Sequence, residues 1–373
     1  MPTFSRLDHA IDQAIADQRV VGTVVLVARN GETVYHRAAG WADRETRTPM
    51  TERTLFRLAS VTKPIVTTAA LRLVEQGRLR LDDHVTRWLP AFRPARADGQ
   101  VPAITVHQLL THSAGLSYDF MQPADGPYAR HGVSSGLDRP EVGFDDNLRR
   151  ITAAGLSYAP GTAWGYSVAI DVLGAVVAAV AGATLPDTVR QLVTDPLEMH
   201  DTAFSAHDRA RLATPYGDGQ PVPERMGDPH TVIYFGNPVH FSPGRVFDPR
   251  AFPSGGAGMA GSASDVLRLL EAVRTARIVS PGMRAAMLTD HVGPEAQTQG
   301  PGWGFGYGGA VLVDPAPTGT PQSAGTLQWG GAYGHSWFID PVEHLTVVAL
   351  TNTTFEGMSG RFTLDVRDAA YER

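Results

Sequence analysis

The sequence predicts a mixed α/β fold of the α+β type, with one antiparallel sheet built from both ends of the chain. Runs of strand length and composition lie near the two ends, at residues 20–27, 33–37, 305–313, 334–339 and 345–352. The longest helical patterns lie between these runs, at 60–77 and 167–180. We therefore expect the central helices to form a second, mostly helical lobe, with the functional site between the lobes.

The same observations predict a single structural unit over residues 1–373. Its α/β lobe is expected at about 1–60 and 260–373, and its helical lobe, with long loops, at about 61–259. Helices from the two ends of the chain, at 4–15 and 361–371, are expected to flank the sheet.

Local patterns define the individual elements. Phe4, Leu7, Ile11 and Ile15 recur at helical spacing, which predicts an amphipathic first helix. The pair Asn30-Gly31 between two extended runs predicts a hairpin with a tight turn. Further predicted elements are short helices and turns over 81–115, helices at 147–154 and 263–275, the latter capped by Ser262 or Ser264, and a hairpin around 340–344. The glycine- and proline-rich segments 117–146 and 206–258 are predicted loops that form binding walls.

Composition excludes several classes of protein. The 43 % hydrophobic and 19 % charged residues are typical of a soluble globular chain, and a net charge of -6 disfavours nucleic acid or an anionic membrane as a partner. The absence of cysteine excludes disulfides and thiolate catalysis. Aspartates interrupt residues 1–20, so this segment is not predicted to be a signal peptide. Asp171 interrupts the longest apolar tract, which is therefore not predicted to span a membrane. We expect a cytoplasmic enzyme without cofactor, and make no prediction of its oligomeric state.

The first chemical motif is Ser60-Val-Thr-Lys63 at the start of a long apolar helix. Residues three apart share a helix face, so the Lys63 amine can reach the Ser60 hydroxyl. Lys63 is the only lysine among 32 lysines and arginines. An amine can act as a proton acceptor when desolvated, whereas a guanidinium cannot. The pattern favours a serine nucleophile activated by lysine over the alternative of a capping serine and a solvated amine.

Two further segments could complete such a site. Tyr166 follows a Pro-Gly turn, where its phenol could share a proton with Lys63; a core aromatic residue is the alternative. Residues 328–335 are glycine-rich and lie just before a predicted strand, so an N–H of an edge strand could complete an oxyanion hole. A glycine-rich turn without catalytic function is the alternative there.

Taken together, these motifs resemble serine β-lactamases and penicillin-binding proteins, and in particular family VIII carboxylesterases. The resemblance extends over nearly the whole chain. It is carried by the segments Ser60–Pro64, Leu109–Gly115, Pro253–Gly258 and Trp329–Ser336, together with Tyr166-Ser167. It implies a β-lactamase/transpeptidase-like fold and hydrolysis of short-chain carboxylic esters, including the acetyl ester of cephalosporins, through an acyl-enzyme.

The resemblance also implies residue roles. Ser60 is the nucleophile, Lys63 and Tyr166 form the general-base pair, and the N–H groups of Ser60 and Ala332 form the oxyanion hole. The implied substrate-binding residues are Tyr118, Trp329, Gly330 and Gly331, and no metal is implied.

Two departures from the β-lactamase pattern favour neutral esters. Val168 stands where class C β-lactamases have an amide, and Trp329-Gly330-Gly331 replaces Lys-Thr-Gly. The cation and hydroxyl that would hold a β-lactam or peptide carboxylate are therefore missing. A β-lactamase or D-amino-acid peptidase, an acyltransferase using the same acyl-enzyme, and an inactive penicillin-recognising module remain the alternatives.

Two competing signals are set aside. Gly132-Val-Ser134-Ser-Gly136 matches the Gly-x-Ser-x-Gly pattern of α/β-hydrolases, but it lacks the strand and helix which that motif requires. The thirteen histidines contain no His-Glu-x-x-His or His-x-His pair, and His107 and His112 are poorly spaced for one helix face. His335 follows the glycine-rich segment, where it could orient a group or be structural.

Overall fold

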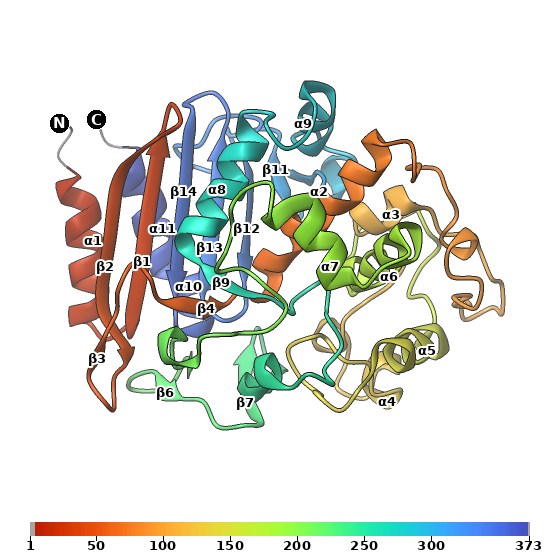
Figure 1. Ribbon diagram of the computed structural model, residues 1–373, viewed down its shortest axis with the longest axis horizontal. Helices are drawn as coiled ribbons and strands as arrows, with labels where there is room; N and C mark the ends of the chain where they lie inside the picture. The colour runs from red at the N-terminus through yellow and green to blue at the C-terminus, as the bar shows by residue number, and fades with distance from the viewer. Residues whose placement is uncertain (1–3, 372–373) are drawn as a thin grey trace.

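The computed structural model describes residues 4–371, and its centre is an antiparallel sheet. Within these residues the sheet has eight strands in the order β10-β11-β12-β13-β14-β1-β2-β3. The N-terminal strand β1 (Gly22–Arg29) pairs with the C-terminal strand β14 (Leu345–Thr351), so that Val25 lies opposite Ala349. The predicted sheet built from both ends of the chain is therefore confirmed, and Figure 1 shows the two termini on the same side of the molecule.

The remaining strands of this sheet are β2 (Glu32–Asp43), β3 (Thr48–Pro49), β10 (Trp303–Phe305), β11 (Ala310–Leu312), β12 (Leu327–Gly331) and β13 (His335–Asp340). Within residues 4–371, three two-stranded pairs lie outside it: β4 (Leu55–Arg57) with β9 (Ala260–Ser262), β5 (Tyr216–Gly217) with β6 (Glu224–Arg225), and β7 (His230–Tyr234) with β8 (Asn237–Phe241).

Helices cover both faces of the sheet. The α-helices in the described residues are α1 (Ser5–Ala16), α2 (Thr62–Glu75), α3 (Val106–Leu110), α4 (Pro127–Arg130), α5 (Phe144–Ala154), α6 (Ala169–Ala181), α7 (Leu185–Val189), α8 (Ala263–Arg274), α9 (Pro281–Met287), α10 (Thr354–Ser359) and α11 (Arg361–Ala370). α1 and α11 pack on one face through a core that includes Leu7, Val347 and Phe362. α8 covers the other face, and Figure 1 shows α2, α3, α5, α6 and α7 grouped beside the sheet.

The predicted first hairpin is confirmed. β1 and β2 pair in antiparallel register, and Asn30 and Gly31 between them have φ angles of 55° and 91°. A tight hairpin turn of this kind requires positive φ at its central residues, which asparagine and glycine adopt at little cost. The sequence of this turn therefore sets the register of the N-terminal strands.

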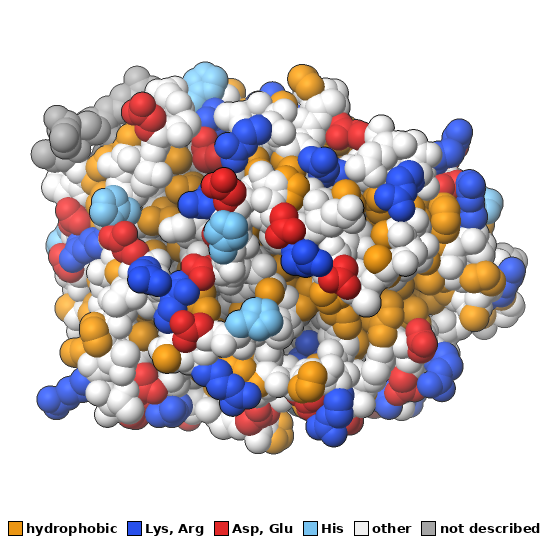
Figure 2. All heavy atoms as spheres, viewed as in Figure 1, with side chains coloured by type: hydrophobic (Ala, Val, Ile, Leu, Met, Phe, Trp, Pro, Cys, Tyr) orange, Lys and Arg blue, Asp and Glu red, His pale blue; other side chains and the backbone are white. Residues whose placement is uncertain are grey.

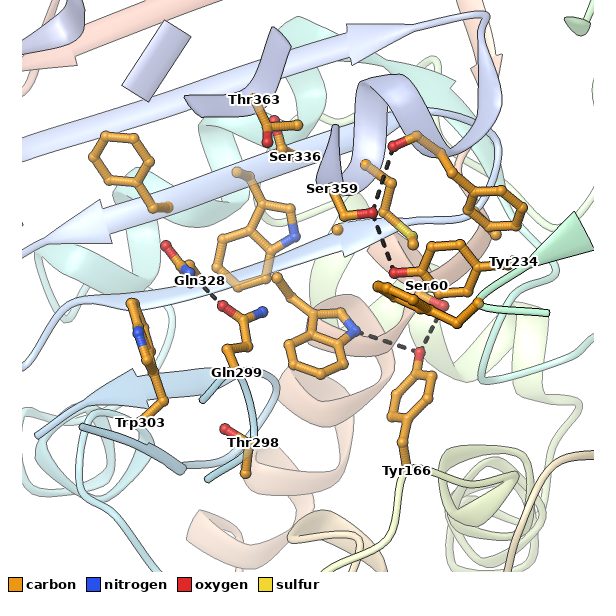
Figure 3. A pocket seen from close by; sticks show the side chains of 18 of the residues that line it. Ser60, Tyr166, Tyr234, Thr298, Gln299, Trp303, Gln328, Ser336, Ser359 and Thr363 are labelled. Carbon is orange, nitrogen blue, oxygen red and sulfur yellow. Dashed lines mark hydrogen bonds between the residues drawn. The ribbon is translucent and has the colours of Figure 1, made fainter. Parts of the chain in front are cut away.

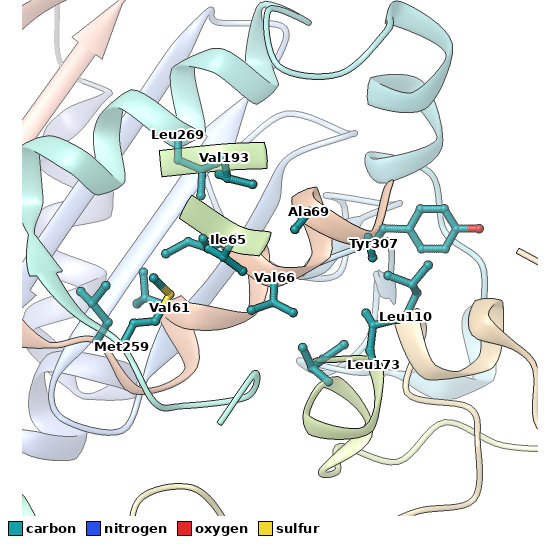
Figure 4. Packing of buried hydrophobic residues seen from close by; sticks show 14 of the residues in the cluster. Val61, Ile65, Val66, Ala69, Leu110, Leu173, Val193, Met259, Leu269 and Tyr307 are labelled. Carbon is teal, nitrogen blue, oxygen red and sulfur yellow. The ribbon is translucent and has the colours of Figure 1, made fainter. Parts of the chain in front are cut away.

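Helix α2 is buried because residues on nearly all its sides are apolar. Ile65, Val66 and Ala69 are fully buried in the larger core, and Figure 4 shows them facing Leu110, Leu173 and Leu269 from three other helices. Such packing fixes the start of α2 relative to its neighbours. The segment that carries Ser60 and Lys63 is therefore held rigidly.

Several element predictions were wrong. Residues 305–313 were predicted as one strand, but Gly306 to Gly309 form a turn between β10 and β11. The predicted loop 206–258 contains the hairpin β7–β8, and helix α9 was not predicted. The segment 328–335 does not simply precede a strand, since its first part is β12, an inner strand of the sheet. The division into two lobes near residues 60 and 260 stays a prediction.

Acidic and basic side chains are interspersed over the face drawn in Figure 2. Among the described residues, no single helix is long and apolar enough to cross a membrane. One pair of helices, Ala169–Ala181 with Leu185–Thr194, is together long and apolar enough for a membrane span, but it is bent by 80° at the break between them. The predicted cytoplasmic location stays a prediction.

Candidate active site

A cavity of about 830 Å³ lies where β12, the start of α2 and the loop before α6 meet. Its wall includes Ser60, Tyr166, Trp329 and Ala332, which come from three separate parts of the sequence. Figure 3 shows the Ser60 and Tyr166 side chains pointing toward each other inside this cavity. The cavity therefore brings together residues from all three motifs.

Ser60 lies in a single 3₁₀ turn, Ala59–Val61, that leads directly into α2. Ala59 has a φ of 45°, a left-handed conformation that costs energy for a residue with a Cβ. Residues held in such conformations concentrate at functional sites, where the surrounding packing maintains them. The strained turn places the Ser60 hydroxyl on the cavity wall.

Lys63 is 2 % exposed, and its amine has two hydrogen-bond acceptors. Nζ donates to Ser60 Oγ at 3.1 Å and to the Gly256 carbonyl at 2.9 Å. It also lies 4.7 Å from the centre of the Tyr166 ring. A buried amine is costly unless it is hydrogen-bonded, and these contacts meet that requirement while aiming Nζ at the serine.

Asp171 on α6 holds the loop that supplies the Gly256 carbonyl. Its Oδ1 accepts from Ser254 Oγ at 2.5 Å and from the Gly256 N–H at 3.2 Å. The other oxygen, Oδ2, is buried without a hydrogen-bond partner. Burial raises the pKa of Asp171, and its hydrogen bonds and the nearby Lys63 charge oppose that shift. The carboxylate thus fixes the carbonyl that orients Lys63.

Tyr166, on the loop before α6, contacts the same serine. Its hydroxyl donates to Ser60 Oγ at 2.7 Å and accepts from Trp329 Nε1 at 3.3 Å. The neighbouring Ser167 N–H donates to His112 Nδ1 at 3.2 Å, and the His112 ring lies 5.0 Å from the Tyr166 ring. Burial lowers the pKa of His112 well below its usual value, and the Lys63 charge adds to the shift. His112 therefore acts as a neutral support for the tyrosine loop.

The β12–β13 connection forms the third wall. No described residue accepts a hydrogen bond from the Ala332 N–H. A Cβ at Gly331 would lie 2.5 Å from the Leu58 carbonyl, so glycine permits the close approach of β12 to the Ser60 turn. His335 Nε2 donates to the Arg57 carbonyl at 2.7 Å, which ties β13 to the chain leading to Ser60. Burial lowers the pKa of His335 to about 4, so it is neutral at pH 7.

The implied substrate-binding residues differ in their positions. Tyr118, Trp329 and Gly330 line the cavity, and Tyr118 is also stacked on Phe120 at 4.7 Å. Gly331 is not part of the cavity wall, because it lies against the Leu58 carbonyl and Val61. His112, Asp171 and Gly256 were not predicted as site residues. His112 and Gly256 lie in two of the segments that carry the family resemblance, and Asp171 is a charged residue inside an otherwise apolar helix, but no role was predicted for any of the three.

The Gly-x-Ser-x-Gly motif lies elsewhere in the fold. Ser134 is fully buried and donates to Asp138 Oδ1 at 2.8 Å. The short helix α4 precedes it, and no strand leads into it within the described chain. This supports the interpretation that the Gly-x-Ser-x-Gly match is coincidental and that Ser134 is not a nucleophile.

The histidines do not gather into a metal site. The structure, over residues 4–371, has no group of three or more His, Cys, Asp or Glu side chains that could hold a metal ion. His107 Nδ1 is instead 2.8 Å from the Tyr307 hydroxyl.

Comparison with known proteins gives the family. The beta-lactamase family model matches residues 7–372. Esterase EstB of Burkholderia gladioli is 55 % identical over 377 residues, covering 99 % of this chain and 95 % of that protein. The solved structure of EstCE1, a hydrolase with promiscuous acyltransferase activity, has 50 % identity and a TM-score of 0.97, with 98 % of each chain covered.

A more distant structure, simvastatin synthase LovD of Aspergillus terreus, has 22 % identity and a TM-score of 0.76, with 98 % of this chain and 97 % of that chain covered, and supports the fold alone. The predicted β-lactamase/transpeptidase-like fold is confirmed by these matches. The chain belongs to the beta-lactamase family.

Proposed function

We propose that this protein is a serine carboxylesterase that hydrolyses short-chain esters through an acyl-enzyme on Ser60. The esterase class agrees with the 55 % identity to EstB over nearly the full length of both proteins. The observation that carries the residue assignment is the convergence of two groups on one oxygen. Lys63 Nζ and the Tyr166 hydroxyl lie 3.1 Å and 2.7 Å from Ser60 Oγ.

The proposed reaction has two steps. Ser60 Oγ attacks the ester carbonyl carbon while its proton passes to the Tyr166–Lys63 pair, and the N–H groups of Ser60 and Ala332 stabilise the oxyanion. The bond to the alcohol breaks, and the pair returns the proton to the leaving oxygen. Water then attacks the acyl group, the pair takes its proton, and the acid leaves as Ser60 recovers its hydrogen.

Neutral small-molecule esters are the proposed substrates. Trp329 stands where β-lactamases have a lysine, and its indole N–H is directed to the Tyr166 hydroxyl. A substrate carboxylate at this position would therefore face the Trp329 indole in place of the ammonium group of a lysine. Cleavage of the acetyl ester of cephalosporins remains within this proposal, because it does not require opening of the β-lactam ring.

Acyl transfer is the second candidate, favoured by the 50 % identity to EstCE1, a hydrolase with promiscuous acyltransferase activity. An alcohol would replace water in attack on the same acyl-enzyme. The ratio of transfer to hydrolysis, measured with added alcohols, separates the two outcomes.

The test is hydrolysis of p-nitrophenyl acetate by the wild type and by Ser60→Ala and Ser134→Ala variants. We expect loss of Ser60 to lower kcat by about 10³-fold or more, because the covalent route disappears. Intact-mass measurement should detect an acetyl adduct in the wild type and the Ser134 variant. If Ser134→Ala abolished the activity while Ser60→Ala left it intact, the assignment of the nucleophile would be wrong.

A further inference from the structure

The cavity extends away from Ser60 in two directions of different chemistry. Figure 3 shows Ser60 and Tyr166 between Tyr234 on one side and Gln299, Gln328 and Trp303 on the other. The Tyr234 side is mainly apolar, with Leu137, Val239 and Phe355 in one cluster with Tyr234, and its Tyr234 and Ser359 hydroxyl groups bond each other. The other side carries amide and hydroxyl groups, with Gln299, Gln328, Thr298 and Thr320 on its wall.

The proposed function assigns the polar side to the alcohol part of the ester. The Tyr166–Lys63 pair must return a proton to the leaving oxygen, so that oxygen must come within hydrogen-bonding reach of the Tyr166 hydroxyl. The same hydroxyl accepts from Trp329 Nε1 at 3.3 Å, and Trp329 packs against the cluster that contains Trp303. The alcohol group therefore leaves along the wall formed by Trp329, Trp303 and the adjacent Gln328.

The amides on this wall form a directed chain of hydrogen bonds. Thr320 Oγ1 donates to Gln322 Oε1 at 2.9 Å, and Gln322 Nε2 donates to Gln328 Oε1 at 2.8 Å. Gln328 Nε2 in turn donates to Gln299 Oε1. Gln322 is 2 % exposed, so the chain is anchored in the protein interior.

The last amide of the chain has an unused donor. No residue within 4–371 accepts a hydrogen bond from Gln299 Nε2, although its Oε1 is occupied by Gln328. Gln299 itself lines the cavity. The chain therefore ends at the cavity in a carboxamide whose N–H group has no acceptor in the described residues, while its oxygen already accepts from Gln328.

We propose that Gln299, oriented by Gln328 and Gln322, forms an alcohol subsite that selects esters whose leaving alcohol carries an acceptor oxygen, such as an ether or a carbonyl. This inference rests on the proposed function and adds the class of leaving group. Gln299 is the specificity-determining residue, and Gln328 and Gln322 are positioning residues. Gln299 is exposed, so its free N–H is otherwise hydrated. An ether oxygen on the alcohol can replace that water as the acceptor, whereas an alkyl ring of the same size offers no acceptor.

The test compares two acetates that share an acyl group and nearly share a shape: tetrahydropyran-4-yl acetate, which has a ring ether oxygen, and cyclohexyl acetate, which has none. The readout is the ratio of kcat/KM for the first ester over the second. A Gln299→Glu variant is the sharpest change, because a carboxylate still accepts from Gln328 but no longer donates into the cavity. Gln299→Leu removes both functions, and Gln100→Leu, at an exposed position outside the cavity wall, is the matched control.

We expect both Gln299 variants to lower this ratio by about twofold to tenfold, the effect of one neutral hydrogen bond. Gln100→Leu should leave the ratio unchanged. If the Gln299→Glu variant had an unchanged or increased kcat/KM ratio, the proposed alcohol subsite would be wrong. If Ser60→Ala cleaved both esters at the wild-type rate, the proposed function would fail instead, so the two failures are distinguishable.

Discussion

Two serines with motif-like surroundings, Ser60 and Ser134, differ in what their hydroxyl oxygens face. Ser60 Oγ accepts hydrogen bonds from an amine and a phenol and lies on the wall of a cavity of about 830 Å³. Ser134 Oγ donates to the Asp138 carboxylate and is fully buried, outside that cavity wall. The difference between the two serines shows that a serine motif indicates a nucleophile only where the hydroxyl oxygen lies on a cavity wall and contacts groups that can accept its proton.

The Ser134 region nevertheless supports the Ser60 region. Asn147 Oδ1 accepts from the Ser134 N–H at 2.8 Å, and Asp138 Oδ1 accepts from the Ser135 N–H at 3.0 Å, so the loop is fixed by internal bonds. A Cβ at Gly136 would lie 2.1 Å from Ser254 Oγ, the group that bonds Asp171. The Gly132–Gly136 segment is thus a rigid packing surface for the loop that orients Lys63.

The largest expected effect comes from changing Lys63 to arginine. Arginine preserves the positive charge but cannot accept a proton from Ser60. We expect kcat/KM for p-nitrophenyl acetate to fall by about 10²- to 10⁴-fold, the usual contribution of general acid–base catalysis. Steady-state kinetics measures this loss.

A Lys63→Met variant is the companion to this test, since it has similar length and no charge. Thermal unfolding and far-UV circular dichroism of both variants check that the fold is retained. Activity in Lys63→Arg within tenfold of wild type would show that Ser60 does not depend on proton transfer to this position, and would remove the main difference between the two serines.

Much of this comparison could be predicted from local sequence. The Asn30-Gly31 turn, the α1 periodicity and the Ser60–Lys63 spacing each depend on residues close in the chain, and local patterns report such features well. The β7–β8 hairpin could not be predicted in this way. Its Tyr234 stacks on Phe355 at 4.1 Å, a contact between residues far apart in sequence, and the hairpin contains Pro238.

The support of the catalytic residues is also non-local. Gly256 lies far along the chain from both Lys63, which it binds, and Asp171, which fixes it. No periodicity connects such positions, so Asp171 could be noticed only as an unusual charge in an apolar helix. The same is true of the chain of amides that ends at Gln299.

The second prediction concerns His335, the buried histidine behind the Ser60 turn. Among the described residues, the Ser134 region has no such histidine. The folded protein lowers the pKa of His335 to about 4 from its ordinary value near 6.5, through burial. Between these two values the unfolded chain binds the proton and the folded chain does not, so stability rises with pH across this window and falls as pH drops through it. We expect His335 to account for about 3 kcal/mol of unfolding free energy lost between pH 7 and pH 4.

Urea unfolding at pH 7, 5.5 and 4.5 measures this dependence, with His335→Gln as the comparison. Glutamine can still donate to the Arg57 carbonyl but does not titrate, so its slope with pH should be shallower than that of the wild type. Parallel slopes for the two proteins would assign the titration to other groups, such as His112.

The smallest expected effect comes from Ser134→Ala. The substitution leaves the buried Asp138 carboxylate without one of its donors, although the Ser135 N–H at 3.0 Å still bonds it. We expect the free energy of unfolding to fall by about 1–3 kcal/mol, the usual cost of an unmade buried hydrogen bond. The value of kcat should stay near wild type at temperatures where the variant is folded, because Ser134 has no place in the cavity. A loss of kcat without loss of stability would mean that the loop beneath Asp171 acts directly on the alignment of Lys63, and the two regions would then form one functional unit.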